Sequence, residues 1–326
     1  MTGAAGSRVL VTVRSFGGTE PRLRQELEAS VREVSWNELG RPLDHSELLE
    51  AIADVDGVIA GVDRFDAEVI ESAQRLRVIA RHGVGTDSVD LAAAARRGVV
   101  VTNTPGANAD AVAELAIGLM LALARQIPRG DRLIRSGGYH PLRGVQLGGR
   151  TVGLIGVGKA GGAVARRASA FGCTVIGFDP ALSHDELRDA GATPARFEQV
   201  VSDADFLSLH VPATDVTRDM VDADFLARMK PGAFLVNTAR GELVVESDLV
   251  RALDEGSLAG VALDATRDEP PRPGNPLLER EDVILTPHSG ADTDEARAAM
   301  GRGALDDLLA VLDGRAPLHP VVPPRA

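Results

Sequence analysis

Residues 153–162 read GLIGVGKAGG, and this stretch decides the fold of the chain. Its glycines fit the pattern G-x-G-x-x-G, which is weak evidence alone because a chain with 35 glycines forms such patterns by chance. The context strengthens the pattern, since a β-branched run at 151–155 precedes the turn and an Ala-rich helical stretch at 160–170 follows it. A strand, a glycine turn and a helix in this order predict a Rossmann-type unit that binds a dinucleotide.

Each glycine of this turn has a physical reason. Gly156 permits the tight turn, Gly158 lets the backbone approach a pyrophosphate, and Gly161 lets the helix pack closely on the strand. The free N–H groups of the helix N-terminus then face the phosphates. Asp179 follows the next predicted strand, at 174–178. Asp-Pro also fits a plain turn, but at this spacing the carboxylate suits the ribose hydroxyls and repels a 2′-phosphate, so the sequence favours NAD over NADP.

Bulk composition narrows the class of protein. The 326 residues suffice for about two domains, and 44% hydrophobic with 25% charged residues is ordinary for a globular protein. A net charge of −12 argues against a nucleic-acid partner, although it does not exclude a small anionic substrate. The single cysteine, Cys173, excludes a disulfide within the chain. With no apolar run of membrane-spanning length and no secretory signal, we expect no membrane partner and a cytoplasmic location.

Short β-branched runs alternate with helix-like stretches, which predicts parallel sheets with helices on both faces. We expect strands at 9–13, 56–60, 78–80, 99–101, 151–156, 174–178, 206–211, 233–237, 260–263 and 283–286. We expect helices at 19–29, 66–72, 87–96, 108–125, 160–170 and 295–313. The long apolar stretch 108–125 is interpreted as a central packing or dimer helix. The Gly-rich segment 129–149 is predicted to be an irregular connection between domains, and 321–326 a disordered tail.

Three polar residues each follow a predicted strand of the second half: Arg240 in NTARG, Glu269 in ATRDEP and His288 in TPHSG. Ligands of open α/β sheets bind beyond the carboxyl ends of the strands, so all three are expected to converge there. His288 fits an acid–base group, Glu269 a partner that orients the imidazole and favours its charge, and Arg240 a fork for a substrate carboxylate. A surface arginine, a solvated glutamate and a turn histidine are each plausible singly, but their joint occurrence beside a cofactor turn favours catalysis.

Several longer motifs carry a resemblance to a known family. They are ARHGVGTDSVD (80–90), VTNTPGANADAVAELAIGLMLALAR (101–125), GLIGVGKAGG (153–162), LHVPAT (209–214), MKPGAFLVNTARGELVVE (229–246), ALDATRDEP (262–270) and TPHSGA (286–291). From about residue 56 to residue 322 the chain resembles the D-isomer-specific 2-hydroxyacid dehydrogenases, most closely their phosphoglycerate dehydrogenase branch. By this resemblance Arg240, Glu269 and His288 match the catalytic arginine, glutamate and histidine of the family.

The resemblance also implies an architecture. It implies two doubly wound α/β domains, with a Rossmann NAD-binding domain at 104–291 inserted into a discontinuous, flavodoxin-like substrate-binding domain made of 1–103 and 292–326. Expected cofactor contacts are Gly156, Gly158, Lys159, Ala160, Gly161, Asp179, Val211, Thr238, Ala239 and Asp264, the last holding the nicotinamide carboxamide. Expected substrate contacts are His82, Gly83, Val84 and Gly85, as a backbone-amide cradle for a carboxylate, together with Arg240. We expect no metal. We expect a homodimer that packs through the long helix and the cofactor domain.

The chain departs from the resembled branch at several places. Ala60 stands where phosphoglycerate dehydrogenases carry an arginine for the substrate phosphate, and Arg64 comes four residues later, which puts phosphoglycerate itself in doubt. His82 replaces a small or apolar residue and fits either a specificity residue or a packed loop histidine. Lys159 and Arg267 suggest a second anionic group on the substrate. Because the chain ends at residue 326, we expect no C-terminal regulatory domain.

The favoured function is NAD-dependent oxidoreduction at C2 of a D-2-hydroxy acid or 2-oxo acid. A phosphite dehydrogenase-like activity is an alternative, since it shares the Arg–Glu–His set, whereas formate dehydrogenase has Gln where Glu269 stands. An NAD(H)-sensing corepressor-like binding protein is an alternative of another class, and those proteins keep the same three residues. The sequence does not identify the acid, the physiological direction or the pathway.

Overall fold

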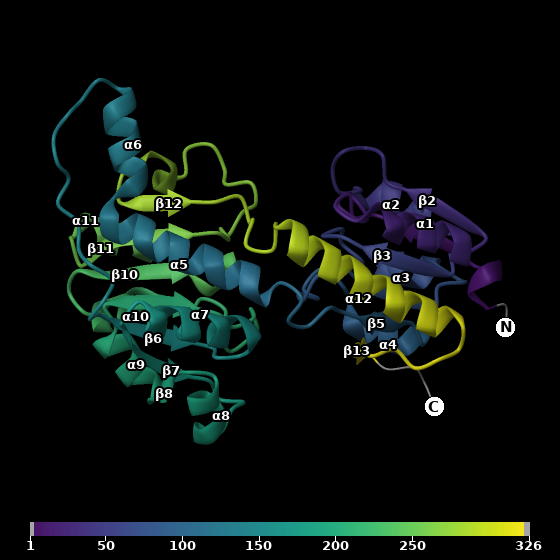
Figure 1. Cartoon of the computed structure of the whole chain (residues 1–326). Helices are drawn as coiled ribbons and strands as arrows, with labels where there is room; N and C mark the ends of the chain where they lie inside the picture. Colours follow the sequence, from purple (N-terminus) through teal and green to yellow (C-terminus); the bar gives the residue numbers. More distant parts are fainter. Residues whose placement is uncertain (1–2, 323–326) are drawn as a thin grey trace. The chain divides into compact units, whose positions relative to one another are not determined.

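A computed structural model describes residues 3–322 of the chain (Figure 1). Within it the chain divides into two compact units: residues up to 108 with those from 292 onward form unit 1, and residues 109–291 form unit 2. The boundary predicted after residue 103 falls after residue 108 instead. Residues 104–108 stay with unit 1 because the Thr104 N–H donates to the Gly83 carbonyl at 3.0 Å and the Ala107 N–H donates to the Thr104 carbonyl.

Unit 1 is built on a sheet of six strands in the order β13-β5-β4-β3-β1-β2. The strands are β1 (Arg8–Val11), β2 (Glu33–Trp36), β3 (Gly57–Ala60), β4 (Val78–Arg81), β5 (Val100–Thr102) and β13 (Pro320–Val322). All pairs are parallel except β13 with β5, which is antiparallel. The parallel part therefore has the flavodoxin order 2-1-3-4-5, which agrees with the flavodoxin-like domain implied by the resemblance, although the strand β2 was not predicted.

Helices cover both faces of this sheet, so its central strands are buried on both sides. The helical segments of unit 1 are η1 (Ala4–Gly6), α1 (Pro21–Ser30), α2 (His45–Ile52), α3 (Ala67–Ser72), α4 (Leu91–Arg97) and α12 (Asp294–Leu312). α2, α3 and α4 form one core with the sheet, and α1 and α12 form the other. Side chains of Asp44, Asp66, Asp90 and Thr293 cap the N-termini of four of these helices.

Unit 2 is built on a seven-stranded parallel sheet in the order β12-β11-β10-β9-β6-β7-β8. Its strands are β6 (Thr151–Ile155), β7 (Thr174–Phe178), β8 (Thr193–Pro194), β9 (Phe206–Leu209), β10 (Ala233–Asn237), β11 (Leu258–Leu263) and β12 (Val283–Leu285). Numbered within the unit this is 3-2-1-4-5-6-7, the order of the Rossmann fold with one added strand. The prediction of two doubly wound domains, one of them a Rossmann domain, is confirmed.

The helices of unit 2 also form two layers (Figure 1). They are α5 (Ala109–Arg125), α6 (Ile127–Arg135), α7 (Lys159–Ala170), α8 (His184–Asp189), α9 (Phe197–Asp203), α10 (Ala223–Arg228) and α11 (Glu246–Asp254), with the short 3₁₀ turns η2 (Gly241–Leu243) and η3 (Pro276–Glu279). α5 and α7 pack side by side on one face, and α9, α10 and α11 pack on the other. This double cover leaves the two ends of the strands uncovered, and the loops beyond their carboxyl ends form one of these two edges.

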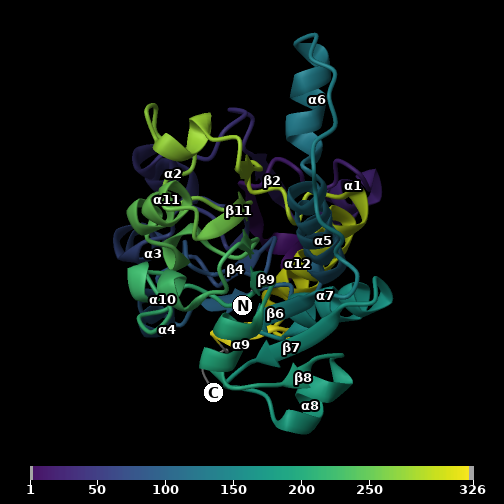
Figure 2. The same cartoon turned by 90° about the vertical axis from the view of Figure 1, so that its left-hand side faces the viewer.

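Two predictions about irregular segments were wrong. Part of the connection predicted at 129–149 is α6, whose apolar residues are exposed, so the usual buried stripe gives no signal. Both views show α6 extending away from the sheet of its own unit (Figure 1 and Figure 2). The tail predicted to be disordered from 321 begins as strand β13, because pairing with β5 orders Pro320–Val322. Positions 323–326 lie outside the described residues.

Among residues 3–322, no single helix is long and apolar enough to span a membrane. α5 and α6 taken together, with a bend of 59° between them, meet those two criteria.

Burial of His82 makes stability depend on acid pH. Its side chain is 9% exposed, and burial lowers the pKa of His82 to about 4 from 6.5. Because the pKa of this histidine is lower in the folded state, its contribution to the free energy of unfolding is fully present above pH 6.5. This contribution is lost as the pH falls toward 4, and the loss amounts to roughly 3 kcal/mol. We expect His82→Leu to lose less stability than the parent between pH 7 and pH 4.5 in urea unfolding. Parallel stability curves for the two proteins would contradict this assignment.

Candidate active site

The glycine turn between β6 and α7 cannot accept side chains at two of its three glycines. Gly156 has φ +88°, and a Cβ there would lie 2.6 Å from the His210 carbonyl oxygen. A Cβ on Gly161 would lie 2.1 Å from the Gly156 oxygen. Gly158 caps α7 without a side-chain hydrogen bond, and a Cβ there would meet open space. The turn is thus tightly packed at Gly156 and Gly161 and open at Gly158, where the N–H groups of the helix N-terminus begin.

Other predicted cofactor contacts surround this turn. The Asp179 carboxylate, at the end of β7, accepts the Val157 N–H at 2.9 Å and the Ala181 N–H at 3.0 Å, so it is held beside the turn. Val211 follows β9, and its Cγ1 lies 2.9 Å from the Cβ position built on Gly156. Lys159 and Ala160 are the first residues of α7. An open helix N-terminus with a carboxylate at the adjoining strand end fits the pyrophosphate and ribose of NAD.

The loop after β10 is shaped by a residue that sequence reasoning missed. Asn237 is fully buried; its Oδ1 accepts the Ala239 N–H at 3.0 Å and its Nδ2 donates to the Arg240 carbonyl at 2.7 Å. These bonds fold the loop back on the strand end and place Arg240 at its outer turn. Thr238 is buried, and its Oγ1 contacts no hydrogen-bond partner among residues 3–322. The one sequence signal was an amide residue at the end of an otherwise apolar strand.

The Arg240 loop packs against the loop that follows β11. A Cβ on Gly241 would lie 2.1 Å from the Thr266 carbonyl, so the two backbones are in direct contact. Arg267 joins the same region: its guanidinium donates to Asp219 and, at 3.0 Å, to the Val244 carbonyl. The structure therefore gives this guanidinium protein partners, and the idea that it binds a second anionic group on a substrate is not supported.

His288 and Glu269 form an ion pair. The His288 Nδ1 lies 2.9 and 3.0 Å from the two Glu269 carboxylate oxygens, with the side chains 45% and 43% exposed. The hydrogen bond with Glu269 raises the pKa of His288, against the opposing effect of burial. With Nδ1 engaged, Nε2 is the ring nitrogen that can exchange a proton with a ligand.

The loop of His288 is held by Asp264. His288 has φ +51°, a conformation that non-glycine residues rarely adopt. Its N–H donates to the Asp264 carbonyl at 2.8 Å. The Asp264 carboxylate, 2% exposed, accepts the Thr286 hydroxyl at 2.6 Å and the Ser289 and Gly290 N–H groups at 2.8 Å each. These bonds tie the loop that carries His288 to the end of β11, contacts of Asp264 that the sequence did not reveal.

The structure brings the predicted triad to one edge of unit 2. β10, β11 and β12 are adjacent parallel strands, and Arg240, Glu269 and His288 lie in the loops beyond their carboxyl ends. The charge of Arg240 lowers the pKa of His288 while that of Asp264 raises it, so these groups are within electrostatic reach. The arrangement supplies an acid–base imidazole backed by a carboxylate, with a guanidinium nearby for an anion.

The predicted cradle, residues 82–85, follows β4 in unit 1. Its first residue differs from the rest: the His82 N–H donates to the Ala60 carbonyl at 3.0 Å, and the imidazole packs edge-on against Phe16 with centroids 6.4 Å apart. Nε2 of His82 is buried and has no hydrogen-bond partner within residues 3–322. Its burial and its contact with Phe16 favour the packed loop histidine over the specificity residue, and Gly83, Val84 and Gly85 form the more exposed part of the loop.

Comparison with known proteins points to one family. The family described as D-isomer specific 2-hydroxyacid dehydrogenase, NAD binding domain, matches residues 117–290. A glyoxylate reductase of Korarchaeum cryptofilum is 38% identical over 283 residues, covering 85% of each chain. A D-3-phosphoglycerate dehydrogenase of Methanocaldococcus jannaschii is 40% identical over 300 residues, covering 91% of this chain but 57% of that protein. The crystal structure of the TT0316 protein from Thermus thermophilus has a TM-score of 0.86 at 41% identity, covering 97% of this chain and 100% of that one.

The ion pair predicts the behaviour of the His288 imidazole. Glu269→Gln removes the carboxylate charge while keeping a hydrogen-bond acceptor, so the pKa of His288 should fall. NMR titration of the imidazole measures the pKa of His288 directly in both proteins. Glu279→Gln, on the exposed turn η3, is the control and should leave it unchanged. An unchanged pKa of His288 in Glu269→Gln would show that the carboxylate does not hold the imidazole in solution.

Proposed function

The chain belongs to the D-isomer-specific 2-hydroxyacid dehydrogenase family and binds NAD, and we propose that it interconverts a small 2-oxo acid and the corresponding D-2-hydroxy acid. The observation that carries the proposal is the contact of His288 with Glu269, 2.9 Å long, at the same edge of the parallel sheet as the dinucleotide turn that follows β6. Bound NADH supplies the hydride for C2, and the chain's own residues supply the proton and bind the substrate.

The roles of the three residues follow from their chemistry. The protonated Nε2 of His288 donates to the carbonyl oxygen during reduction and accepts the hydroxyl proton in the reverse direction. Glu269 holds Nδ1 and keeps the imidazolium charged at higher pH, because it raises the pKa of His288. Arg240 binds the substrate carboxylate and polarises the carbonyl. Reduction should therefore weaken as pH rises through the raised pKa of His288.

The predicted cofactor contacts remain the best candidates to hold NAD. They are Gly156, Gly158, Lys159, Ala160, Gly161, Asp179, Val211, Thr238 and Ala239. Two of the glycines leave no room for a side chain, and Asp179 places negative charge beside the turn, which supports NAD over NADP. For Asp264 we propose the role of holding the His288 loop, since three donors from that loop surround its carboxylate.

For the substrate we favour a small 2-oxo acid without a phosphate. Ala60, at the place of the arginine of phosphoglycerate dehydrogenases, is fully buried. A relative named glyoxylate reductase is 38% identical over 85% of both chains. Glyoxylate and hydroxypyruvate are therefore the first acids to assay.

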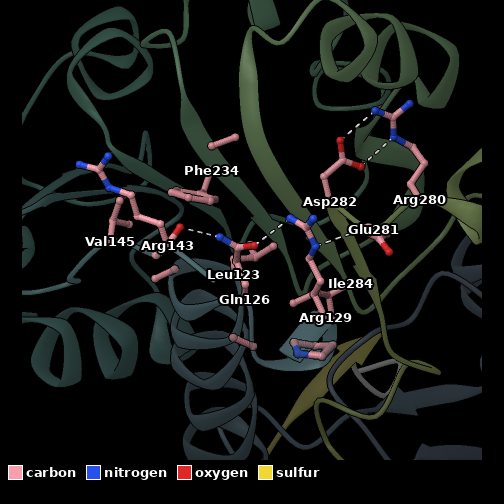
Figure 3. Close-up of a pocket in the computed structure, with 15 residues that line it drawn as sticks. Leu123, Gln126, Arg129, Arg143, Val145, Phe234, Arg280, Glu281, Asp282 and Ile284 are labelled. Carbon is pink, nitrogen blue, oxygen red and sulfur yellow. Dashed lines mark hydrogen bonds and ion pairs between the residues drawn. The ribbon is translucent and has the colours of Figure 1, made fainter. Parts of the chain in front are cut away.

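A second copy of this chain is the proposed partner. α6 has no buried residue, and Ile127 and Ile134 on it are 56% and 57% exposed. Beside it lies a pocket of about 490 Å³ lined by Arg129, Phe234 and Ile284 among others (Figure 3). Exposed apolar side chains next to an open pocket suit a homodimer contact around α5 and α6. The single cysteine accords with the cytoplasmic location that we propose.

Turnover separates the proposed enzyme from an NAD(H)-sensing binding protein. We expect NADH oxidation with at least one of glyoxylate, hydroxypyruvate, phosphonopyruvate and 2-oxoglutarate. His288→Ala should lower kcat by about 10² or more, because general acid catalysis is lost, while NADH still binds. Turnover of phosphite with NAD in place of the oxo acids would favour the phosphite dehydrogenase-like alternative. NADH binding without turnover of any of these compounds would favour the sensor.

A further inference from the structure

The strand order of unit 2 creates a crevice between β6 and β9. From β6 the chain adds β7 and β8 on one side of the sheet, and from β9 it adds β10, β11 and β12 on the other side. At such a switch point the loops beyond the two strands run in opposite directions, and open α/β sheets bind their ligands in the crevice between them. The glycine turn follows β6, and His210 is the first residue after β9.

His210 packs directly against the glycine turn. A Cβ on Gly156 would lie 2.6 Å from the His210 carbonyl oxygen, and a Cβ on Gly161 would lie 3.6 Å from the His210 Cβ. Side chains alternate along a strand, and Phe206 packs in the core beneath α5 and α7. Ser208 and His210 continue this face of β9, so His210 lies beside the first turn of α7.

One nitrogen of the His210 imidazole is fixed and the other is open. Nε2 lies 2.9 Å from the Oγ of Ser208, whose side chain is fully buried. Nδ1 makes no hydrogen bond to any residue from 3 to 322, and solvent reaches it. Desolvation by the surrounding protein lowers the pKa of His210 to about 4, so at pH 7 the ring is neutral and has one N–H group.

Ser208 decides which nitrogen of His210 has the proton. The serine hydroxyl has a single hydrogen atom, and within the described part of the chain the His210 Nε2 is the one partner of Oγ. If Nε2 had the proton, the serine hydrogen would be buried without an acceptor, which is unfavourable. Ser208 therefore donates to Nε2, and the proton of the neutral ring is on Nδ1, the open nitrogen.

We propose that His210 is a coenzyme-binding residue whose Nδ1–H donates to an oxygen of the pyrophosphate–ribose part of NAD, and that Ser208 is the positioning residue that sets this tautomer. The dinucleotide of a Rossmann domain crosses the crevice at the switch point, so its oxygens are the acceptors that come to the end of β9. Burial is the one cause of the lowered pKa of His210 among residues 3–322, so no protein carboxylate competes for the N–H. The proposal concerns the coenzyme and does not depend on the identity of the acid.

NMR of the ring nitrogens tests the tautomer before any coenzyme is added. Long-range nitrogen–hydrogen correlation spectra at pH 7 should show Nδ1 protonated and Nε2 unprotonated in His210, whose signals are those missing from His210→Asn. Ser208→Ala removes the donor to Nε2 and should shift the ring toward the form protonated on Nε2. Ser202→Ala, on the exposed side of α9, is the matched control and should leave the His210 signals unchanged.

Isothermal titration with NADH tests the contact with the coenzyme. His210→Phe keeps a ring but has no N–H group, so NADH should bind about tenfold more weakly. His210→Asn can present an amide N–H near the position of Nδ1, so its NADH affinity should stay within about twofold of the parent. Ser208→Ala leaves the tautomer unset and should weaken NADH binding by about threefold. ADP-ribose, which lacks the nicotinamide but keeps the pyrophosphate and ribose groups, should lose affinity by the same factors.

A role in packing alone would give a different pattern. If His210→Asn binds NADH as weakly as His210→Phe, ring volume explains the loss and the donor role is overturned. A parent ring protonated on Nε2, unchanged NADH affinity in folded His210→Phe and Ser208→Ala, or a loss with NADH but not with ADP-ribose would also overturn it. If His210→Phe does not fold, Ser208→Ala and the NMR spectra decide. Both measurements are made without substrate, so failure of the parent to turn over any 2-oxo acid would count against the proposed function alone.

Discussion

One buried carboxylate sets the geometry on which the candidate chemistry depends. Asp264 is 2% exposed, and an ionised carboxylate at such a position must be surrounded by donors. Its donors come from the Thr286–Gly290 segment, which is thereby bound to the end of β11 with His288 in a left-handed conformation. In this conformation the imidazole contacts Glu269, whose hydrogen bond raises the pKa of His288, and the charge of Asp264 adds to the effect.

Within residues 3–322, both units place backbone N–H groups without a hydrogen-bond partner at strand ends, by different means. In unit 2 two glycines without room for a Cβ shape the turn, and the free amides belong to the first residues of α7. In unit 1 side chains hold the carbonyls of the loop after β4, and the peptide planes turn their amides outward. The free amides at the start of α7 suit a pyrophosphate.

The sequence predicted the parts that depend on local pattern. The glycine turn, both doubly wound sheets and the strand-end positions of Arg240, Glu269 and His288 follow from periodicity and parallel topology. The turn supports of Asn237 and Asp264 were missed, because their partners are backbone groups that only folding brings close. Arg267 looked available for a ligand, yet Asp219, 48 residues earlier, binds it. The helix α6 has an exposed apolar face, so no buried stripe marked it.

The most direct measurement is the kinetics of Asp264→Asn with the best 2-oxo acid. Asparagine keeps the size of the side chain, but its NH₂ group would face the N–H donors of Ser289 and Gly290. Two donors cannot bond to each other, so the loop should lose its fixed conformation. If the hydrogen bonds of Asp264 position His288, kcat should fall by about 10² because His288 is misplaced, while NADH affinity should stay within about threefold. A normal kcat combined with a large loss of NADH affinity would contradict it and assign Asp264 to the coenzyme.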